Sequence, residues 1–245
     1  MIINKNILIT GTTSGIGLEL ENYFKKKNKV ISINRANSKI KKKNINFKTD
    51  ITELEKVKNI LIDLKKKNFL PDIVILNAGV NNYDKIDYFN IKNFKRCFDI
   101  NFYGAINFVA AIDELKLKNI KIIFFSSTST IIPNPSALGY YSSKLLLKKL
   151  TKLFNVNISN NVFKCAILGP IKTKITRNLL KPKGIAGYIY KLLLVDPVDM
   201  IKDFEKFILK KKIFFHFTLV SVFTYYFISI IITFFPNINK GPQNK

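Results

Sequence analysis

The chain has 245 residues, of which 47% are hydrophobic, so it can bury one sizeable core and global disorder is not expected. The net charge of +25 comes almost entirely from lysine, which argues against specific nucleic-acid binding because arginine is the preferred partner of phosphates and base edges. Two cysteines, Cys97 and Cys165, and one histidine, His216, argue against a disulfide framework, a Ser-His-Asp site and a metal site.

Short apolar runs alternate along the chain with longer segments of helical periodicity. The runs predict strands at 7–10, 30–33, 45–47, 73–76, 121–125 and 162–167, and the periodic segments predict helices at 15–27, 52–68, 91–117 and 138–154. Apolar runs separated by helices are typical of parallel strands buried on both faces. The sequence therefore predicts an α/β fold with a doubly wound, mostly parallel sheet of Rossmann type.

A glycine-rich turn follows the first predicted strand and opens the first predicted helix. Its glycines are Gly11, Gly15 and Gly17, in the spacing Gly-x3-Gly-x-Gly. Glycines at this place permit a tight turn and a close approach of the backbone to a pyrophosphate at the positive end of the helix. A purely structural turn is the alternative, but the position between strand and helix favours dinucleotide binding.

These motifs resemble the short-chain dehydrogenase/reductase family over roughly residues 5–175. The resemblance rests on the turn at 10–17 and on Asn77-Ala78-Gly79 after the fourth predicted strand. It implies a set of cofactor-binding residues in the turn, at the end of the fourth strand and after the third strand, where Asp50 would contact the adenine. These residues are Gly11, Thr13, Ser14, Gly15, Ile16, Gly17, Asp50, Ile51, Asn77, Ala78 and Gly79.

A tyrosine and a lysine four residues apart place a phenol and an ammonium group on one face of a helix. The cation favours the phenolate and so lowers the pKa of the tyrosine. The pattern occurs at 23/27, 88/92 and 140/144, and chance on a solvated helix is the alternative for any one of them. Only Tyr140 and Lys144 follow a serine cluster at the end of a predicted strand.

The family resemblance implies four catalytic residues, which are Asn101, Ser127, Tyr140 and Lys144. Ser127 and Tyr140 would hydrogen-bond the substrate oxygen, Tyr140 would donate the proton, and Lys144 would also bind the nicotinamide ribose. Asn101 would hold a water that links Lys144 to solvent. Ser126 competes with Ser127, and its alternative role is a strand-terminal hydroxyl that satisfies backbone groups.

Two further segments concern the cofactor. Asn34 and Arg35 end the second predicted strand, where a carboxylate would favour NAD; the arginine can instead pair with a 2′-phosphate, which predicts NADP(H), with NAD as the alternative. After the sixth predicted strand, residues 168–173 resemble the family's Pro-Gly-x-Val-x-Thr, with Leu168 in place of the proline. Ile171 and Thr173 would contact the carboxamide end of the nicotinamide.

The C-terminal part is apolar. Residues 213–236 contain no Asp, Glu, Lys or Arg and could cross a bilayer as a helix, or 213–217 could form a seventh strand followed by a hydrophobic helix in the membrane interface or at a dimer contact. We expect membrane contact on the cytoplasmic face, or else a cytoplasmic protein, because residues 1–6 do not resemble a signal peptide. The predicted organisation is a Rossmann-type domain at 1–212, a membrane-associated or transmembrane segment at 213–236 and a polar tail at 237–245.

The sequence thus predicts an oxidoreductase that transfers hydride between NADP(H) and a small-molecule carbonyl or secondary alcohol. Apolar residues at 185–194 and the apolar tail favour a lipidic substrate. The alternatives are a sugar dehydrogenase or epimerase-like enzyme and a non-catalytic NADP-binding redox sensor. A sensor needs no proton relay, so the four catalytic residues argue against it. Family members are often dimers or tetramers, and a homo-oligomer is consistent with the resemblance.

Overall fold

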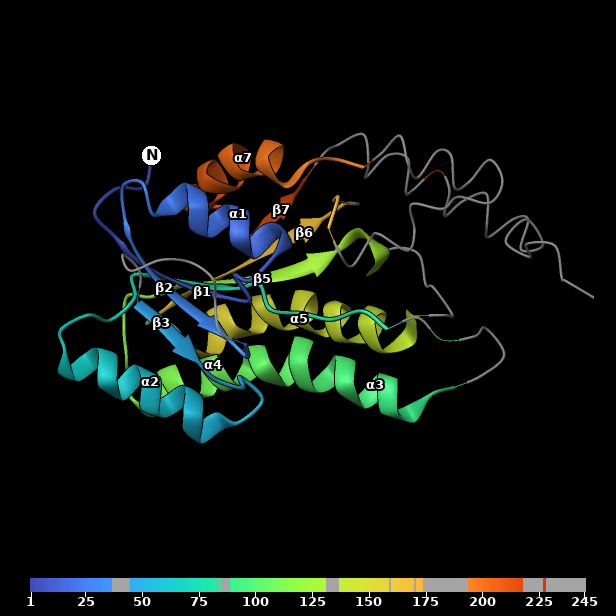
Figure 1. The fold of residues 1–245 in the computed structure, drawn as a ribbon, viewed down its shortest axis with the longest axis horizontal. Coiled ribbons are helices and arrows are strands. Elements are labelled where there is room, and N and C mark those ends of the chain that lie inside the picture. Colours follow the sequence, from blue (N-terminus) through green and yellow to red (C-terminus); the bar gives the residue numbers. More distant parts are fainter. Residues whose placement is uncertain are drawn as a thin grey trace, which may run out of the picture.

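The computed structural model describes residues 1–36, 45–82, 84, 89–130, 137–158, 160–169, 171–173, 194–217 and 227. A seven-stranded sheet lies at its centre, in the order β3-β2-β1-β4-β5-β6-β7, and every neighbouring pair is parallel (Figure 1). The strands are β1 (Asn6–Thr10), β2 (Lys29–Asn34), β3 (Ile45–Lys48), β4 (Ile73–Leu76), β5 (Lys121–Ser127), β6 (Val162–Leu168) and β7 (Phe214–His216). The predicted doubly wound parallel sheet is confirmed.

Helices cover both faces of the sheet. Helices α1 (Gly15–Phe24) and α7 (Pro197–Leu209) lie on one face, and α2 (Leu54–Lys66), α4 (Gly104–Glu114) and α5 (Leu138–Asn157) lie on the other (Figure 1). This double cover explains the apolar strand sequences, because β1 and β4 have no side chain in contact with bulk water over most of their length. Two hydrophobic clusters result, one on each face.

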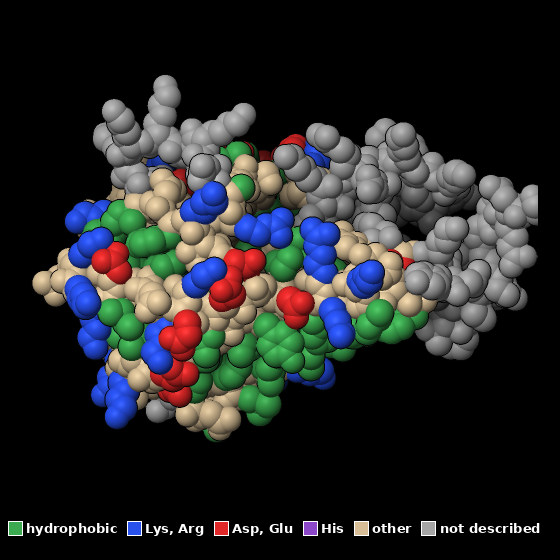
Figure 2. Space-filling view, turned by 60° about the horizontal axis from the view of Figure 1, so that its bottom comes forward, with side chains coloured by type: hydrophobic (Ala, Val, Ile, Leu, Met, Phe, Trp, Pro, Cys, Tyr) green, Lys and Arg blue, Asp and Glu red, His purple; other side chains and the backbone are tan. Residues whose placement is uncertain are grey.

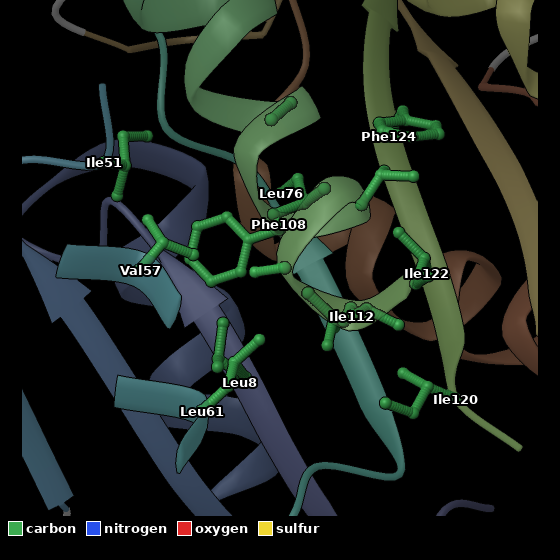
Figure 3. Close-up of a cluster of buried hydrophobic side chains, with 14 of the residues drawn as sticks. Leu8, Ile51, Val57, Leu61, Leu76, Phe108, Ile112, Ile120, Ile122 and Phe124 are labelled. Atoms are coloured by element: carbon green, nitrogen blue, oxygen red, sulfur yellow. The ribbon is translucent and has the colours of Figure 1, made fainter. Parts of the chain in front are cut away.

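The larger cluster fills the space between the sheet and helices α2 and α4. Phe108 of α4 is fully buried at its centre, between Val57 and Leu61 of α2 and the strand residues Leu8 and Leu76 (Figure 3). Dense apolar packing of this kind fixes the position of α2 and α4 relative to the sheet. The carboxyl ends of the strands, where a doubly wound fold binds its ligand, are therefore held in a rigid frame.

The predicted helix at 91–117 is a composite. Helix α3 (Ile91–Cys97) continues into a π-helical turn, η1 (Phe98–Tyr103), before α4 begins at Gly104. Single π-helical turns inside longer helices are often found at functional sites. Apolar periodicity gives no signal for such a turn, so the sequence predicts one continuous helix.

Helix α7 was not predicted, although its sequence carries a signal. Pro197 occupies its first turn, and its buried residues recur at helical spacing; they are Met200, Ile201, Phe204, Glu205, Phe207 and Ile208. It packs beside α1 and completes the cover of that face.

The C-terminal apolar stretch begins inside the sheet. Strand β7 pairs in parallel with β6, with Phe214 opposite Cys165 and His216 opposite Ile167. Of the alternatives for 213–236, the seventh strand is therefore confirmed for its first residues, which belong with the Rossmann-type sheet. The remainder, apart from residue 227, lies outside the described residues, as do the tail at 237–245 and most of the segment at 185–194. Within the described residues, no helix has the length and apolar character needed to span a membrane.

Candidate active site

The glycine turn lies between β1 and α1 and is held by Asn77. Gly11 and Gly15 have φ angles of +73° and +62°, a region that favours glycine. The Asn77 side chain donates to the carbonyl oxygens of Thr10 and Gly11, at 2.9 and 3.0 Å. A Cβ atom on Gly17 would lie 2.2 Å from the carbonyl oxygen of Gly11, so only glycine allows the first turn of α1 to approach so closely.

Asn34 also holds this turn, from the end of β2. Its side-chain oxygen accepts from the Thr12 amide at 2.7 Å, and its NH₂ group donates to the Thr12 hydroxyl at 3.0 Å. Both groups are buried. The contact with Thr12 was not predicted, because nothing in the spacing of 12 and 34 links them. It shows that Asn34 orders the turn, while the neighbouring Arg35 is exposed.

A cavity of about 360 Å³ runs along the carboxyl ends of the strands. Most predicted site residues line it: Gly11, Thr13, Ser14, Gly15, Ile16, Asn34, Arg35, Asp50, Ile51, Asn77, Ala78, Gly79, Ser127, Tyr140, Lys144, Ile171 and Thr173. Gly17 and Asn101 do not line the cavity, but each contacts a residue that does. Gly17 packs against the backbone of Gly11, and Asn101 is hydrogen-bonded to Val80.

Asp50 and Arg35 both line the cavity, and they lie close enough for their charges to interact. Its carboxylate accepts from the amide and the hydroxyl of Thr52, at 3.0 and 2.9 Å. The backbone hydrogen bond from Thr52 is the main cause that lowers the pKa of Asp50, and the charge of Arg35 acts in the same direction. Asp50 is therefore ionised at neutral pH and lies within electrostatic reach of Arg35.

Ser126 and Ser127 have different environments at the end of β5. The Ser126 hydroxyl is buried and donates to the backbone carbonyl of Lys144 at 2.9 Å. Ser127 is only partly buried. Its hydroxyl oxygen accepts hydrogen bonds from the amide and the hydroxyl of Ser129, at 3.1 and 2.9 Å. The Ser127 proton is therefore left for another acceptor. This arrangement favours Ser127 as the hydroxyl that faces a ligand.

Tyr140 and Lys144 lie one turn apart on α5. The Lys144 Nζ atom is 5.9 Å from the centre of the Tyr140 ring, and its side chain is only 4% exposed. Burial lowers the pKa of Lys144 to about 8, although the nearby Cys165 and Cys97 thiols act to raise it. The lysine is thus a cation near neutral pH with little water to screen its charge.

Asn101 occupies the π-helical turn η1 and is 1% exposed. Its side-chain oxygen accepts from the Val80 amide at 2.7 Å, and its NH₂ group donates to the Val80 carbonyl at 2.9 Å and to the Ser143 hydroxyl at 3.1 Å. Ser143 in turn donates to the carbonyl of Tyr140 at 2.8 Å. Asn101 therefore ties the end of β4 to α5, and both of its N–H groups are used within the protein.

Ser143 and Val80 are contributors that the motif spacing did not single out. Ser143 precedes the lysine of the Tyr-x3-Lys pattern, and a serine inside a helix usually faces solvent or its own backbone. Here it is fully buried against η1. Only the packing of α5 on η1 shows its role.

Of the other two Tyr-x3-Lys pairs, the structure describes the tyrosine of the pair at 23/27, and this tyrosine has a different environment. Tyr23 donates to the buried carboxylate of Glu205 at 2.9 Å, and burial is the first cause that raises its pKa. Tyr88 lies outside the described residues. Among the described residues, no cluster of His, Cys, Asp and Glu could hold a metal ion.

Comparison with known proteins identifies relatives of this chain. A family model described as short chain dehydrogenase matches residues 5–184. An uncharacterized oxidoreductase of Schizosaccharomyces pombe is 34% identical over 156 residues, which are 60% of this chain and 62% of that protein. This match and two others, to uncharacterized yeast oxidoreductases, span 62%, 41% and 52% of the relatives' own lengths.

Solved structures share the fold. A 4-hydroxyisoleucine dehydrogenase complexed with NADH has a TM-score of 0.73 at 23% identity, covering 87% of this chain and 96% of its own. A short chain dehydrogenase of Burkholderia cenocepacia, in complex with NADP, has a TM-score of 0.73 at 16% identity, covering 96% and 95%. At these identities the likeness concerns the fold.

Proposed function

Because the chain belongs to the short chain dehydrogenase family, we propose that it is an oxidoreductase that transfers hydride between NADP(H) and a carbonyl or secondary alcohol. One observation carries the proposal: Ser127, Tyr140 and Lys144 line the same cavity as the glycine turn. A proton donor and a dinucleotide cradle therefore face one space. The oxidoreductase names of the relatives support the same activity.

The cavity fits a nicotinamide dinucleotide. Gly11, Gly15 and Gly17 leave the turn without side chains where a pyrophosphate would approach the N-terminus of α1. Arg35, Asp50, Ile171 and Thr173 also line the cavity. In this proposal Arg35 and Asp50 would contact the adenosine, and Ile171 and Thr173 would contact the carboxamide end of the nicotinamide. The bound cofactor supplies or accepts the hydride. Relatives whose structures contain NADH or NADP support this choice of cofactor.

In the proposed reduction, the protein stabilises charge on the substrate oxygen and delivers a proton to it. Ser127 donates a hydrogen bond to that oxygen, and Tyr140 donates the proton. The buried Lys144 ammonium favours the phenolate that Tyr140 becomes, because little water screens the two groups from each other. Asn101 holds α5 in place against the segment that follows β4, through its hydrogen bonds to Val80 and Ser143.

The relay water expected at Asn101 is constrained by these contacts. Both N–H groups of its amide are donated to Val80 and Ser143. A water bound here would therefore donate to an oxygen atom of Asn101. The proposed role of Asn101 is first to position the site and second to accept from a relay water.

We propose NADP(H) as the preferred cofactor on the basis of Arg35. Asn34 is engaged with Thr12 and carries no charge to repel a 2′-phosphate. Arg35 follows it, lines the cavity and is exposed. An arginine in this position can form charged hydrogen bonds with the phosphate.

The proposal is tested by NADPH consumption. The full-length protein is mixed with NADPH and a panel of acyl, sterol-like and sugar-derived carbonyls, and absorbance of the reduced cofactor is followed. Turnover of any carbonyl supports the proposed oxidoreductase activity. The class of carbonyl with the highest turnover distinguishes the predicted lipidic substrate from the sugar alternative. Tight NADPH binding with no turnover across the panel would favour the redox sensor instead.

A further inference from the structure

Many of the described lysines lie at the end of the molecule opposite the cofactor cavity. Because all strands are parallel, the residues that precede strands and follow helices lie at one end. This end carries the exposed lysine runs 25–27, 65–67 and 210–212, together with Lys5, Lys116 and Lys118. We call this set the basic end face. In Figure 2, Lys and Arg side chains gather along the left edge, where this end lies.

Hydrogen bonds join these loops into one surface. The Asn4 amide donates to the Lys27 carbonyl at 2.9 Å, and the Lys29 amide donates to the Lys5 carbonyl at 2.9 Å. On the other side, the Lys121 ammonium donates to the Ile208 carbonyl at 2.8 Å, at the end of α7. The lysines are therefore held by adjacent, ordered segments that are distant in sequence.

The positive charge of this face is only partly neutralised. Lys5 pairs with Asp72 at 3.1 Å, and Lys67 pairs with Asp63 at 2.8 Å. Within the part of the chain that the structure describes, no ion pair involves the runs 25–27 and 210–212. The face therefore presents a net positive field.

Aliphatic side chains are exposed among these lysines. Met1 is 71% exposed, Val156 is 76% exposed and Leu209 is 52% exposed. Ile3, Val162 and Ile213 are also exposed at this end, next to the starts of β1, β6 and β7. Exposed aliphatic groups interleaved with lysine match the chemistry of a bilayer interface, which offers both anionic head groups and apolar chains.

We propose that the basic end face docks on an anionic lipid bilayer. A nucleic acid fits less well, because no arginine and no exposed aromatic ring of the described residues lies on this face to grip or stack on bases. The docked orientation turns the cofactor cavity away from the lipid and toward water. The inference does not depend on the proposed enzymatic activity, and it uses residues other than the apolar stretch at 213–236, apart from the exposed Ile213.

The test is co-sedimentation of the full-length protein with vesicles of phosphatidylcholine, with and without phosphatidylglycerol. Binding is expected only with the anionic lipid and is expected to weaken as salt is raised. The triple variant Lys25→Gln, Lys26→Gln, Lys27→Gln is expected to lose roughly tenfold or more in partition, since each lysine near a surface contributes several-fold. The double variant Val156→Ser, Leu209→Ser is expected to bind more weakly with an unchanged salt dependence.

The matched control removes the same charge elsewhere. Lys92, Lys95 and Lys202 are exposed on α3 and α7, away from the basic end face, and their triple change to Gln is expected to have a much smaller effect. All variants keep residues 218–245, so a contribution from that segment is equal in each. Equal loss in both triple variants, binding to neutral vesicles, no binding at all, or tighter binding to a single-stranded oligonucleotide would overturn the proposal.

Discussion

At the scale of single residues, the site depends on where one buried ammonium group, one phenol and two adjacent serine hydroxyls are held. Lys144 is buried and lies beside Tyr140, whereas Ser126 and Ser127, adjacent in sequence, differ in what they contact. Both serines line the cavity, but the Ser126 proton is donated to the backbone carbonyl of Lys144, whereas Ser127 accepts from Ser129 and keeps its own proton to donate. This difference leads to a direct comparison of two variants.

Ser127→Ala is expected to lower kcat by about a hundredfold, because it removes a hydrogen bond to the oxygen on which charge develops. Ser126→Ala is expected to lower the free energy of unfolding by about 1 kcal/mol and to leave kcat within a few-fold, because its partner is the carbonyl of Lys144. Steady-state kinetics and urea unfolding of the two variants check this. The reverse ranking in kcat would assign the catalytic hydroxyl to Ser126.

Arg35 is expected to set the cofactor preference. Arg35→Ala should weaken NADPH binding by about tenfold or more while changing NADH binding little, since only the 2′-phosphate loses a charged hydrogen bond. Dissociation constants for both cofactors, measured by fluorescence titration on wild type and variant, provide the check. Tighter binding of NADH than NADPH by the wild type would contradict the assignment.

At the scale of elements, the junctions between strand ends and helices position the site. The turn after β1 is held by Asn77 and Asn34, and the π-helical turn η1 is held by Asn101. Each of these amides binds backbone groups of a neighbouring strand end or turn. The cofactor cavity is therefore shaped mostly by side chains that fix the backbone.

Gly17→Ala tests the junction of the turn and α1. The added Cβ would lie 2.2 Å from the Gly11 carbonyl oxygen, and backbone at that distance has to move. We expect NADPH binding to weaken by at least about tenfold, even though alanine is the better helix former by about 1 kcal/mol. Asn22→Ala in the same helix is the control, because the Asn22 side chain accepts a hydrogen bond from the exposed Lys25 side chain and lies outside the cavity lining. Unchanged binding in Gly17→Ala would show that the turn does not contact the cofactor.

The elements also show what a sequence can and cannot foretell. The strands and the glycine turn were predictable because apolar runs and glycine spacing are local signals. The π-helical turn, the contact of Asn34 with Thr12 and the role of Ser143 were not, because each depends on which segments pack together. Helix α7 was missed even though Pro197 and its apolar periodicity mark it.

At the scale of the whole molecule, buried ionisable groups make stability depend on pH. Burial lowers the pKa of both Lys144 and Lys164 to about 8, from 10.5. Above pH 8 the unfolded chain therefore binds more protons at these lysines than the folded chain does, and stability rises with pH. Cys165 acts in the opposite direction above pH 9, because burial raises its pKa to about 12.

The free energy of unfolding is therefore expected to rise by on the order of 2 kcal/mol between pH 8 and pH 9, and less steeply above that. Urea unfolding at several pH values checks this. Lys164→Met, which removes one of the two lysines, is expected to halve the rise. A flat or falling profile between pH 8 and pH 9 would contradict the buried state of both lysines.

The molecule as a whole has two functional ends in this account. The cofactor cavity lies at the carboxyl ends of the strands, and the basic end face lies at their amino ends. The parallel sheet separates the two ends by the length of its strands. Substitutions in the cavity are therefore expected to change turnover and cofactor binding but not vesicle binding, and substitutions on the basic end face are expected to do the reverse.

The central claim is that the Tyr140 phenol donates the proton in a cavity that also holds the dinucleotide. The most direct test is Tyr140→Phe, assayed for turnover of the best carbonyl found and for NADPH binding. Turnover is expected to be lost, by about a thousandfold or more, with the NADPH dissociation constant changed only slightly. Full turnover in Tyr140→Phe would contradict the account.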